Sequence, residues 1–337
     1  MADILTVENL ALGFRTEGGL ARVLDCVNLT VRPGEIVSLV GESGCGKSTL
    51  ASAILGTLPR GLAVVGQGSV TLDGADMLRA GAAAGKVRGR TVTFVPQDPF
   101  ASFNPLFRVG TQIMDLMRWK SPRRREGSWF YSPRRRRADR EAVIAMLEAV
   151  QLPQPARLLQ KYPHELSGGQ RQRLMIAMAL LPEPRLIIAD EPTTALDVTV
   201  QAQILGVLRR LAVQRGVAVL FTTHDLGAAW EICDRVTVMY AGQTAEIAPR
   251  DSFFTAPHHP YTRLLLRSLP EEGRDPVGIP GSVPSPLSPP LGCRFHPRCP
   301  RADARCQAER PVLRGEADHL AACHHPVLAA QEARLDA

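Results

Sequence analysis

The sequence is 337 residues long, enough for one large domain with an appended part, and 45% of its residues are hydrophobic. Its uncharged apolar runs stay well short of the roughly 20 residues that a membrane-spanning helix needs. Asp3 lies where a signal peptide would be positively charged, so we expect the chain in the cytoplasm. Seven cysteines in such a chain favour metal binding over a disulfide framework.

The net charge of +7 comes from one segment. Residues 118–140 contain ten Lys or Arg against two acidic residues, a local charge of +8, which leaves about −1 for the rest of the chain. The basic balance is therefore a property of this segment and does not by itself indicate a nucleic-acid-binding protein.

The first predicted elements are strands. Residues 5–10 and 23–31 alternate apolar and polar side chains, as half-buried strands do, and residues 32–35 form the turn after them. Residues 36–40 are a short apolar run, typical of a strand covered on both faces, and a helix is predicted from Lys47 onward.

The middle of the chain changes to helical periodicity between residues 97 and 166, which predicts an inserted helical subdomain. Two further apolar runs, 186–189 and 217–222, lead to Asp190 and His224. Buried strands that end in polar residues predict a mostly parallel α/β sheet with its site along one edge.

A phosphate-binding loop follows the strand at 36–40. Residues 41–48 fit G-x-x-x-x-G-K-[ST] between a strand and a helix, although a glycine-rich turn is the structural alternative. Backbone amides would surround the β-phosphate, Lys47 would reach the β- and γ-phosphates, and Ser48 would bind magnesium. The nucleotide-binding loop residues are Gly41, Ser43, Gly44, Cys45, Gly46, Lys47, Ser48 and Thr49.

Three polar residues supply the predicted chemistry. Asp190 is placed to hold magnesium through water, and Glu191 to orient and deprotonate the attacking water. His224 is placed to hydrogen-bond the γ-phosphate. If it stood alone, the Asp190-Glu191 pair would suit a solvated helix start, and His224 would suit a structural role. Because these residues follow successive predicted strands, a catalytic site is favoured.

The stretch from Leu166 to Arg173, LSGGQRQR, resembles the signature sequence of ABC ATPases. The resemblance implies a phosphate-loop NTPase core (ABC ATPase) of the α/β class with an antiparallel β subdomain, to which the sequence itself adds the inserted helical subdomain and a small C-terminal cysteine module. It also implies that Gln97 is the glutamine that contacts magnesium at the join to the helical subdomain, that residues 195–197 are the D-loop, and that Phe14 stacks on adenine. A phenylalanine near a strand end is also commonly a core residue.

In ABC ATPases the signature binds the nucleotide of a partner. We expect a helix to begin near Gln170, directly after Ser167, Gly168 and Gly169. The free backbone amides and the positive end of the helix dipole at this point would face a γ-phosphate. The resemblance therefore implies a head-to-tail dimer of identical or homologous ATPases, which drives two transmembrane permease subunits.

Motifs outside the shared ATPase sequences resemble the ATPases of dipeptide and oligopeptide importers. They are residues 96–99, 102–105, 162–166, 190–198, 259–262 and 292–300. This resemblance implies an enzyme that hydrolyses ATP at the cytoplasmic face of the inner membrane to power peptide import, supplied indirectly by an extracytoplasmic peptide-binding protein. The alternatives are import of another small solute, such as a nickel complex or glutathione, and a soluble ABC ATPase acting on nucleic acid; we expect no nucleic acid, because neither a second ATPase set nor a coiled-coil insertion is present.

The predicted organisation has four parts. An ATPase core spans 1–96 and 167–248, the helical subdomain 97–166 with its basic insertion 118–140, an extension and linker 249–291, and a cysteine module 292–326.

The tail cysteines have the spacing C-x5-C-x6-C-x16-C: Cys293, Cys299, Cys306 and Cys323. Four thiolates suit zinc or an iron–sulfur cluster, and the spacing does not decide between them. Resemblance favours a [4Fe-4S] cluster, with Zn²⁺ and unligated thiols as alternatives. The nearby histidines that would suit zinc are His296, His319, His324 and His325.

Two further hypotheses concern single features. Cys45 stands where serine is common, and an accessible thiol there would be prone to oxidation. The basic insertion flanks Trp129, Phe130 and Tyr131, which suits anionic lipid head groups; a disordered, solvated loop is the alternative.

Overall fold

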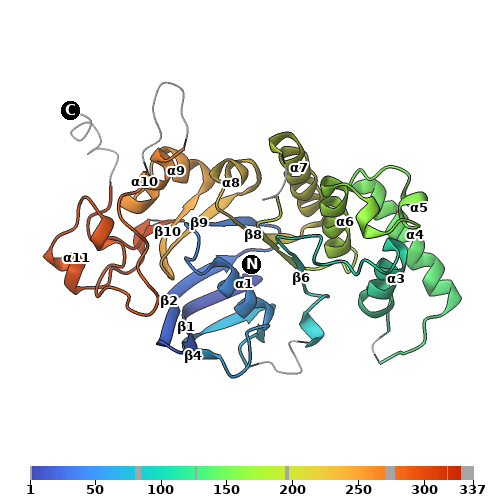
Figure 1. Cartoon of the computed structure of the whole chain (residues 1–337), viewed down its shortest axis with the longest axis horizontal. Helices are drawn as coiled ribbons and strands as arrows, with labels where there is room; N and C mark the ends of the chain where they lie inside the picture. The colour runs from blue at the N-terminus through green and yellow to red at the C-terminus, as the bar shows by residue number, and fades with distance from the viewer. Residues whose placement is uncertain are drawn as a thin grey trace. The chain divides into compact units, whose positions relative to one another are not determined.

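A computed structural model of the chain describes residues 2–79, 85–125, 127–193, 197–269, 278–316 and 318–327. The chain forms two compact units (Figure 1). Unit 1 contains Met1–Ile4, Val31–Ile36 and Ala80–Thr222, and unit 2 contains Leu5–Thr30, Val37–Arg79 and Thr223–Ala337. The predicted helical subdomain belongs to unit 1, and the cysteine module belongs to unit 2.

Unit 2 contains an antiparallel sheet with the strand order β2-β1-β4-β5. The strands are β1 (Leu5–Thr16), β2 (Gly19–Val31), β4 (Ala63–Leu72) and β5 (Ala75–Asp76). Leu5 pairs with Leu72 and Phe14 with Ala63 along β1 and β4. The alternating residues predicted strands here, and the structure forms the expected antiparallel β subdomain from them.

The other strands of unit 2 belong to a second sheet. They are β3 (Ile36–Val40), β9 (Arg235–Tyr240), β10 (Gln243–Pro249), β11 (Arg314–Glu316) and β12 (His319–Ala321). β3 pairs parallel with β9, β9 antiparallel with β10, and β10 antiparallel with β12, which pairs with β11. The cysteine module thus extends the ATPase sheet by its own two strands.

Short helices complete unit 2. They are α1 (Lys47–Leu55), α8 (Leu226–Ile232), α9 (Arg250–Thr255), α10 (Pro260–Arg267), η2 (His296–Arg298) and α11 (Ala304–Ala308). α1 begins at Lys47, as the sequence predicts, and Gly56 ends it in the left-handed conformation that glycine favours.

Unit 1 combines parallel strands with a group of helices. β6 (Val92–Val95), β7 (Leu186–Asp190) and β8 (Ala218–Thr223) pair in parallel, with β7 in the middle. The helices are α3 (Val109–Lys120), α4 (Pro133–Ala149), α5 (Pro155–Leu158), η1 (Pro163–Glu165), α6 (Gly168–Leu180) and α7 (Val198–Arg215). Figure 1 shows α3, α4 and α5 gathered beside α6.

The second half of the basic insertion is helical rather than a loop. Arg134–Arg137 form the first turns of α4, which Pro133 opens and which Ser132 caps by accepting a hydrogen bond from the Arg135 N–H. The fully buried carboxylate of Asp139 accepts a hydrogen bond from Ser121 at 2.7 Å and lies 3.4 Å from the Arg135 guanidinium. This anchor orders a segment whose composition favoured a solvated loop.

In the part of the chain that the structure describes, no helix is both long enough and apolar enough to span a bilayer. Ala195 and Leu196 of the predicted D-loop lie outside the described residues, as do residues 270–277 of the predicted linker.

Candidate nucleotide-binding and cysteine sites

The phosphate-binding loop joins β3 to α1 in unit 2. Gly41, Gly44 and Gly46 have φ values of 152°, 79° and 105°, which disfavour side chains. A Cβ at Gly41 would lie 2.1 Å from the carbonyl oxygen of Met239, so only glycine fits there. Lys47 Nζ donates hydrogen bonds to the carbonyl oxygens of Gly41 at 2.7 Å and Glu42 at 3.3 Å. The loop therefore has the backbone shape that a phosphate cradle needs.

Cys45 does not fit the oxidation hypothesis. Its side chain is 1% exposed, and burial raises the pKa of the thiol, against the opposing influence of Lys47. A buried, protonated thiol is a poor nucleophile, so the expectation of an accessible and reactive cysteine is wrong.

Gln97, Asp190 and Glu191 come together in unit 1. β7 ends at Asp190, and the next residue, Glu191, has a left-handed φ of 44°, which is strained for a residue with a side chain. Gln97 Nε2 donates a hydrogen bond to Glu191 Oε2 at 3.0 Å. The catalytic carboxylate predicted from the sequence is thus held by the predicted glutamine.

Thr222 is a residue that the sequence reasoning missed. Its hydroxyl donates a short hydrogen bond to Asp190 Oδ1 and accepts one from the Glu191 N–H at 3.2 Å. The Glu191 N–H also donates to the Thr222 carbonyl at 3.0 Å. Because Thr222 pairs with Asp190 at the carboxyl end of β8, its position on the neighbouring strand was the signal that could have identified it.

His224 and Phe14 lie in unit 2, the unit of the phosphate loop. His224 follows β8 directly and is exposed. Phe14 lies in β1 opposite Ala63 and is half-buried, so it is not a fully buried core residue. Their contacts with γ-phosphate and adenine stay predictions.

The signature forms the amino end of α6 in unit 1. The helix begins at Gly168, two residues earlier than expected, because Ser167 and Gln170 form a capping box: Ser167 Oγ accepts the Gln170 N–H at 3.3 Å and Gln170 Oε1 accepts the Ser167 N–H at 3.1 Å. Gly168 and Gly169 occupy the first helical positions, where N–H groups have no partner within the helix. Asp197 of the predicted D-loop caps α7 by accepting the Val200 N–H at 2.9 Å.

The four tail cysteines line one small cavity in unit 2. Cys293, Cys299, Cys306 and Cys323 are brought together there, and Cys26, Cys45 and Cys233 do not line it. Burial and the neighbouring thiols raise the pKa of Cys323 to about 12, and burial raises that of Cys293 to about 11. Four soft donors that line one cavity suit a thiophilic metal or cluster, whose positive charge would favour the thiolate forms.

The tail histidines divide into two groups. His296, His324 and His325 line the cysteine cavity. His319 does not; its Nε2 lies 2.7 Å from the buried Glu246 carboxylate, and its ring stacks on that of His258 with centroids 3.6 Å apart. His319 is thus engaged at β10, away from the cavity where a zinc ion would lie.

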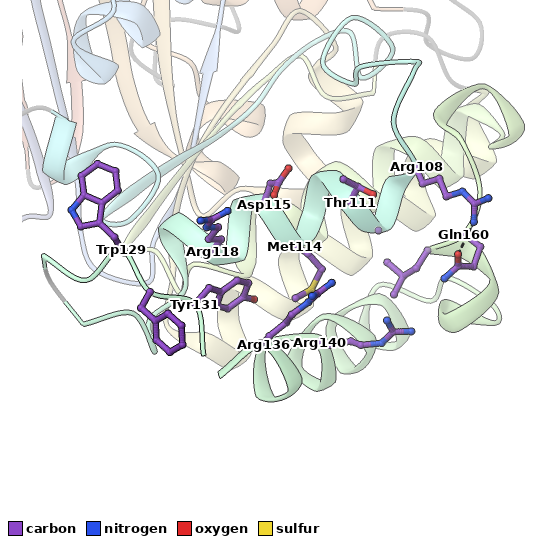
Figure 2. A pocket seen from close by; sticks show the side chains of 13 residues that line it. Arg108, Thr111, Met114, Asp115, Arg118, Trp129, Tyr131, Arg136, Arg140 and Gln160 are labelled. Carbon is purple, nitrogen blue, oxygen red and sulfur yellow. Dashed lines mark hydrogen bonds between the residues drawn. The ribbon is translucent and has the colours of Figure 1, made fainter. Parts of the chain in front are cut away.

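A basic groove of about 620 Å³ lies between α3, α4 and the insertion in unit 1 (Figure 2). Arg118, Arg136 and Arg140 line it, and the described residues provide no ion pair to any of the three. Trp129 and Phe130 are 80% and 72% exposed at its rim. The groove therefore combines unpaired positive charge with accessible aromatic surface.

Comparisons with known proteins agree with these features. The ABC transporter family profile matches residues 24–194, and that of the oligopeptide/dipeptide transporter C-terminal region matches residues 245–306. The chain is 43% identical over 317 residues to a putative peptide import ATP-binding protein of Brucella abortus, covering 93% of this chain and 92% of the relative. It is 41% identical over 329 residues to the dipeptide transport ATP-binding protein DppD of Escherichia coli, covering 96% and 97%.

Solved structures are similar as well. A dimeric post-hydrolysis state of the ATP-binding cassette MJ0796 bound to ADP and phosphate matches with a TM-score of 0.61 at 28% identity, over 73% of this chain and 98% of that one. The cbiO1 protein of Clostridium perfringens, part of an ABC transporter complex, matches with a TM-score of 0.62 at 25% identity, over 76% and 92%. The chain has a phosphate loop, a helix-capping signature and a Gln97–Glu191 pair, and its relatives are more than 40% identical over nearly the whole length. It therefore belongs to the ATP-binding subunits of ABC transporters.

Proposed function

We propose that this protein hydrolyses ATP to power the import of dipeptides or oligopeptides. The observation that supports this most is the near full-length similarity to peptide import ATPases, which includes the C-terminal region as well as the ATPase core. Retention of the Gln97–Glu191 pair favours an active enzyme over a module that only binds ATP.

The roles of the ATPase residues follow from their chemistry. Lys47 and the loop amides bind the phosphates, His224 hydrogen-bonds the γ-phosphate, and Phe14 stacks on adenine. Glu191 deprotonates the attacking water, and Gln97 orients that carboxylate. Ser48, Gln97 and Asp190 would hold Mg²⁺, which supplies charge neutralisation at the phosphates.

The functional unit is a head-to-tail dimer. The N–H groups of Gly168 and Gly169, which have no partner within the helix, suit a γ-phosphate presented by a second ATPase subunit. Two permease subunits in the membrane complete the transporter, and a peptide-binding protein supplies the substrate from outside the cell. In this assembly the chain lies on the cytoplasmic face of the inner membrane.

The four-cysteine cavity is a metal site in this proposal, with a [4Fe-4S] cluster favoured over Zn²⁺. The donor set is four soft sulfurs, and the surrounding module is too small to fold on a core of its own. Metal analysis of anaerobically purified protein tests this. About four iron atoms per chain, lost in Cys299→Ser, would support the cluster, and one zinc ion per chain would support the alternative. A protein that contains no iron and no zinc would contradict a metal site.

The basic groove is a contact for anionic lipid head groups in this proposal, because it joins unpaired arginines to exposed aromatic rings. The test compares binding of the wild type and an Arg136→Glu/Arg140→Glu variant to vesicles with and without phosphatidylserine. Weaker binding of the variant to the anionic vesicles alone is expected. Equal binding of both proteins would contradict it.

Uptake of labelled dipeptides tests the transport function. Cells that lack the gene should regain uptake with the wild-type gene and with Glu141→Gln, an exposed control position, but not with Glu191→Gln. Normal dipeptide uptake without the gene would contradict peptide import, and loss of uptake of another small solute in the same cells would support that alternative.

A further inference from the structure

The cysteine module contacts the phosphate loop at Glu42. Arg298 holds both carboxylate oxygens of Glu42, with Nη1–Oε2 at 2.8 Å and Nη2–Oε1 at 3.2 Å. The N–H of Glu42 donates to the Tyr261 hydroxyl at 3.0 Å, and its carbonyl accepts from Lys47 at 3.3 Å. Every polar group of this loop residue is therefore held, two of them by residues C-terminal to the ATPase core.

Arg298 is itself fixed in place. Its side chain is 4% exposed. Nε donates to the Pro280 carbonyl at 2.7 Å, Nη2 to the Ile279 carbonyl at 3.2 Å, and Nη1 to the Tyr240 hydroxyl at 3.3 Å. A planar guanidinium with this many partners has one orientation, and that orientation presents its two terminal nitrogens to Glu42.

The same short turn contributes to the cysteine cavity. Cys293 and Cys299 both line the cavity, and Arg298 directly precedes Cys299. Between the two cysteines the chain is tightly coiled, with the Arg298 N–H bonded to the Phe295 carbonyl at 3.0 Å and the Cys299 N–H to the His296 carbonyl at 3.3 Å. A group bound by the cysteines would thus fix the backbone from which Arg298 extends.

We infer that Arg298 is a positioning residue that couples the filling of the four-cysteine site to ATP binding at the phosphate loop. The inference rests on the proposed function in taking the loop as the ATP site and the cysteines as a metal site. The module is then more than a structural appendage, because the state of its metal affects nucleotide affinity through one ion pair.

Two physical effects give this coupling its sign. With Arg298 in place, Glu42 is ordered before ATP binds, so less conformational freedom is lost on binding. The guanidinium also neutralises a carboxylate in a loop that receives a triphosphate. Without Arg298 the loop is freer and Glu42 repels the anionic ligand, so both effects weaken ATP binding.

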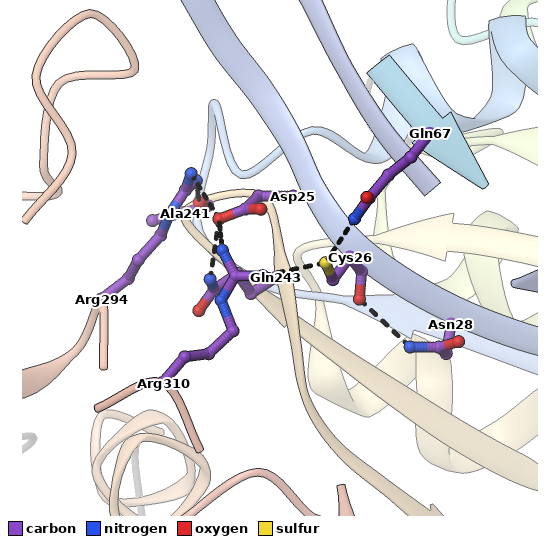
Figure 3. A network of polar contacts seen from close by, with 8 residues as sticks. All are labelled: Asp25, Cys26, Asn28, Gln67, Ala241, Gln243, Arg294 and Arg310. Carbon is purple, nitrogen blue, oxygen red and sulfur yellow. Dashed lines mark hydrogen bonds and ion pairs between the residues drawn. The ribbon is translucent and has the colours of Figure 1, made fainter. Parts of the chain in front are cut away.

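The module has a second attachment, which offers a control. Asp25 of β2 accepts hydrogen bonds from Arg294 at 3.0 Å and Gln243 at 3.0 Å, and pairs with Arg310 (Figure 3). Arg310 also donates to Cys26 Sγ at 2.8 Å. Arg310 attaches the cysteine module to β2 but makes no described contact with the phosphate loop. Arg310→Ala therefore tests the effect of weakening this attachment without changing a contact to the loop.

The experiment measures the ATP dissociation constant, the Tm and the metal content of the full chain, with Glu191→Gln in all proteins to prevent hydrolysis. We expect Arg298→Ala to weaken ATP binding about tenfold with its metal retained, and Arg298→Lys to restore part of the loss. The double variant Arg298→Ala/Glu42→Gln should bind ATP no more weakly than Arg298→Ala, because it lacks the repelling Glu42 carboxylate. Arg310→Ala should lower the Tm while changing the dissociation constant less than twofold.

Metal removal supplies the second arm. Removing the metal from the protein with Arg298 intact should weaken ATP binding about as much as Arg298→Ala does. Removing the metal from the Arg298→Ala variant should weaken its ATP binding little further. Unchanged ATP affinity in Arg298→Ala, or an equal effect of depletion in both proteins, would overturn the inference. A parent protein that binds no ATP would instead contradict the proposed function.

Discussion

The side-chain amide of Gln97 donates a hydrogen bond of 3.0 Å to the carboxylate of Glu191, 94 positions later in the chain. Because Glu191 also has a left-handed backbone, the structure fixes both the position and the direction of the carboxylate predicted to activate water.

Replacing Glu191 with Gln should abolish turnover and leave ATP binding intact. The amide keeps a hydrogen-bonding partner for Gln97 but does not accept a proton, and general-base catalysis contributes on the order of 10²–10⁴-fold to rate. Steady-state phosphate release and equilibrium ATP binding measure the two quantities. Turnover close to that of the wild type would contradict the assignment of Glu191 as base.

Replacing Thr222 with Val should lower turnover while ATP binding is retained. The hydroxyl donates to the half-buried Asp190 carboxylate, and its loss removes that hydrogen bond at a cost of about 1–2 kcal/mol, while the Glu191 N–H keeps its bond to the Thr222 carbonyl. Thr237→Val is the matched control, because the Thr237 hydroxyl is buried on β9 and the described residues give it no hydrogen-bond partner. Equal turnover in the two variants would exclude a specific role for Thr222.

Replacing Gly168 with Asp should prevent ATP-dependent dimerisation. The substitution places a negative charge in the first turn of α6, where a partner's γ-phosphate is proposed to bind. The phosphate loop of the variant chain is unaltered. Light scattering with ATP, in the Glu191→Gln background, measures the dimer. A variant that dimerises as well as its parent, with equal ATP occupancy, would argue against the signature as a partner's nucleotide ligand.

Glu246 should make stability depend on pH in the acid range. Burial alone would raise the pKa of this carboxyl, but hydrogen bonds from His319 and the N–H groups of His258 and His259 lower it from its usual 4.5. Because the pKa of Glu246 is lower in the folded protein than in the unfolded chain, its charge stabilises the fold at pH values above the pKa of the unfolded chain. This stabilisation is lost as the pH falls through the pKa of the folded protein.

Glu246→Gln should therefore be less stable than the wild type by about 2–3 kcal/mol at neutral pH, because charge-assisted hydrogen bonds are lost. The difference should shrink below pH 4.5. Urea unfolding at several pH values measures it. A difference that stays constant from pH 7 to pH 3 would show that the Glu246 charge does not contribute.

Replacing Asp139 with Ala should release the insertion. This buried carboxylate accepts from Ser121 and lies 3.4 and 3.8 Å from Arg135 and Arg123, so its removal leaves positive charge unpaired and should cost about 2–3 kcal/mol. Limited proteolysis should then cut between residues 118 and 133 sooner than in the wild type. Glu141→Ala, at an exposed pair on the same helix, is the control.

Much of the fold was predictable because its signals are local. Alternation gave β1 and β2, the apolar run gave β3, and glycine spacing gave the loop whose positive φ values the structure shows. Predictions that depended on environment were less secure: Cys45 is buried rather than reactive, and Arg134–Arg137 are helical rather than a loop. Burial and long-range ion pairs decide such cases, and neither is visible in spacing.

The sequence by itself determined the family, the phosphate loop, the signature and the four tail cysteines, since these depend on residue types at short fixed intervals. Only the tertiary structure decided that Thr222 joins Asp190 to Glu191, that His319 turns to Glu246, and that Arg298 holds Glu42 across 256 positions of chain. Such contacts depend on how strands and loops pack, because two residues far apart in the chain become partners only when the fold brings their side chains within hydrogen-bonding distance.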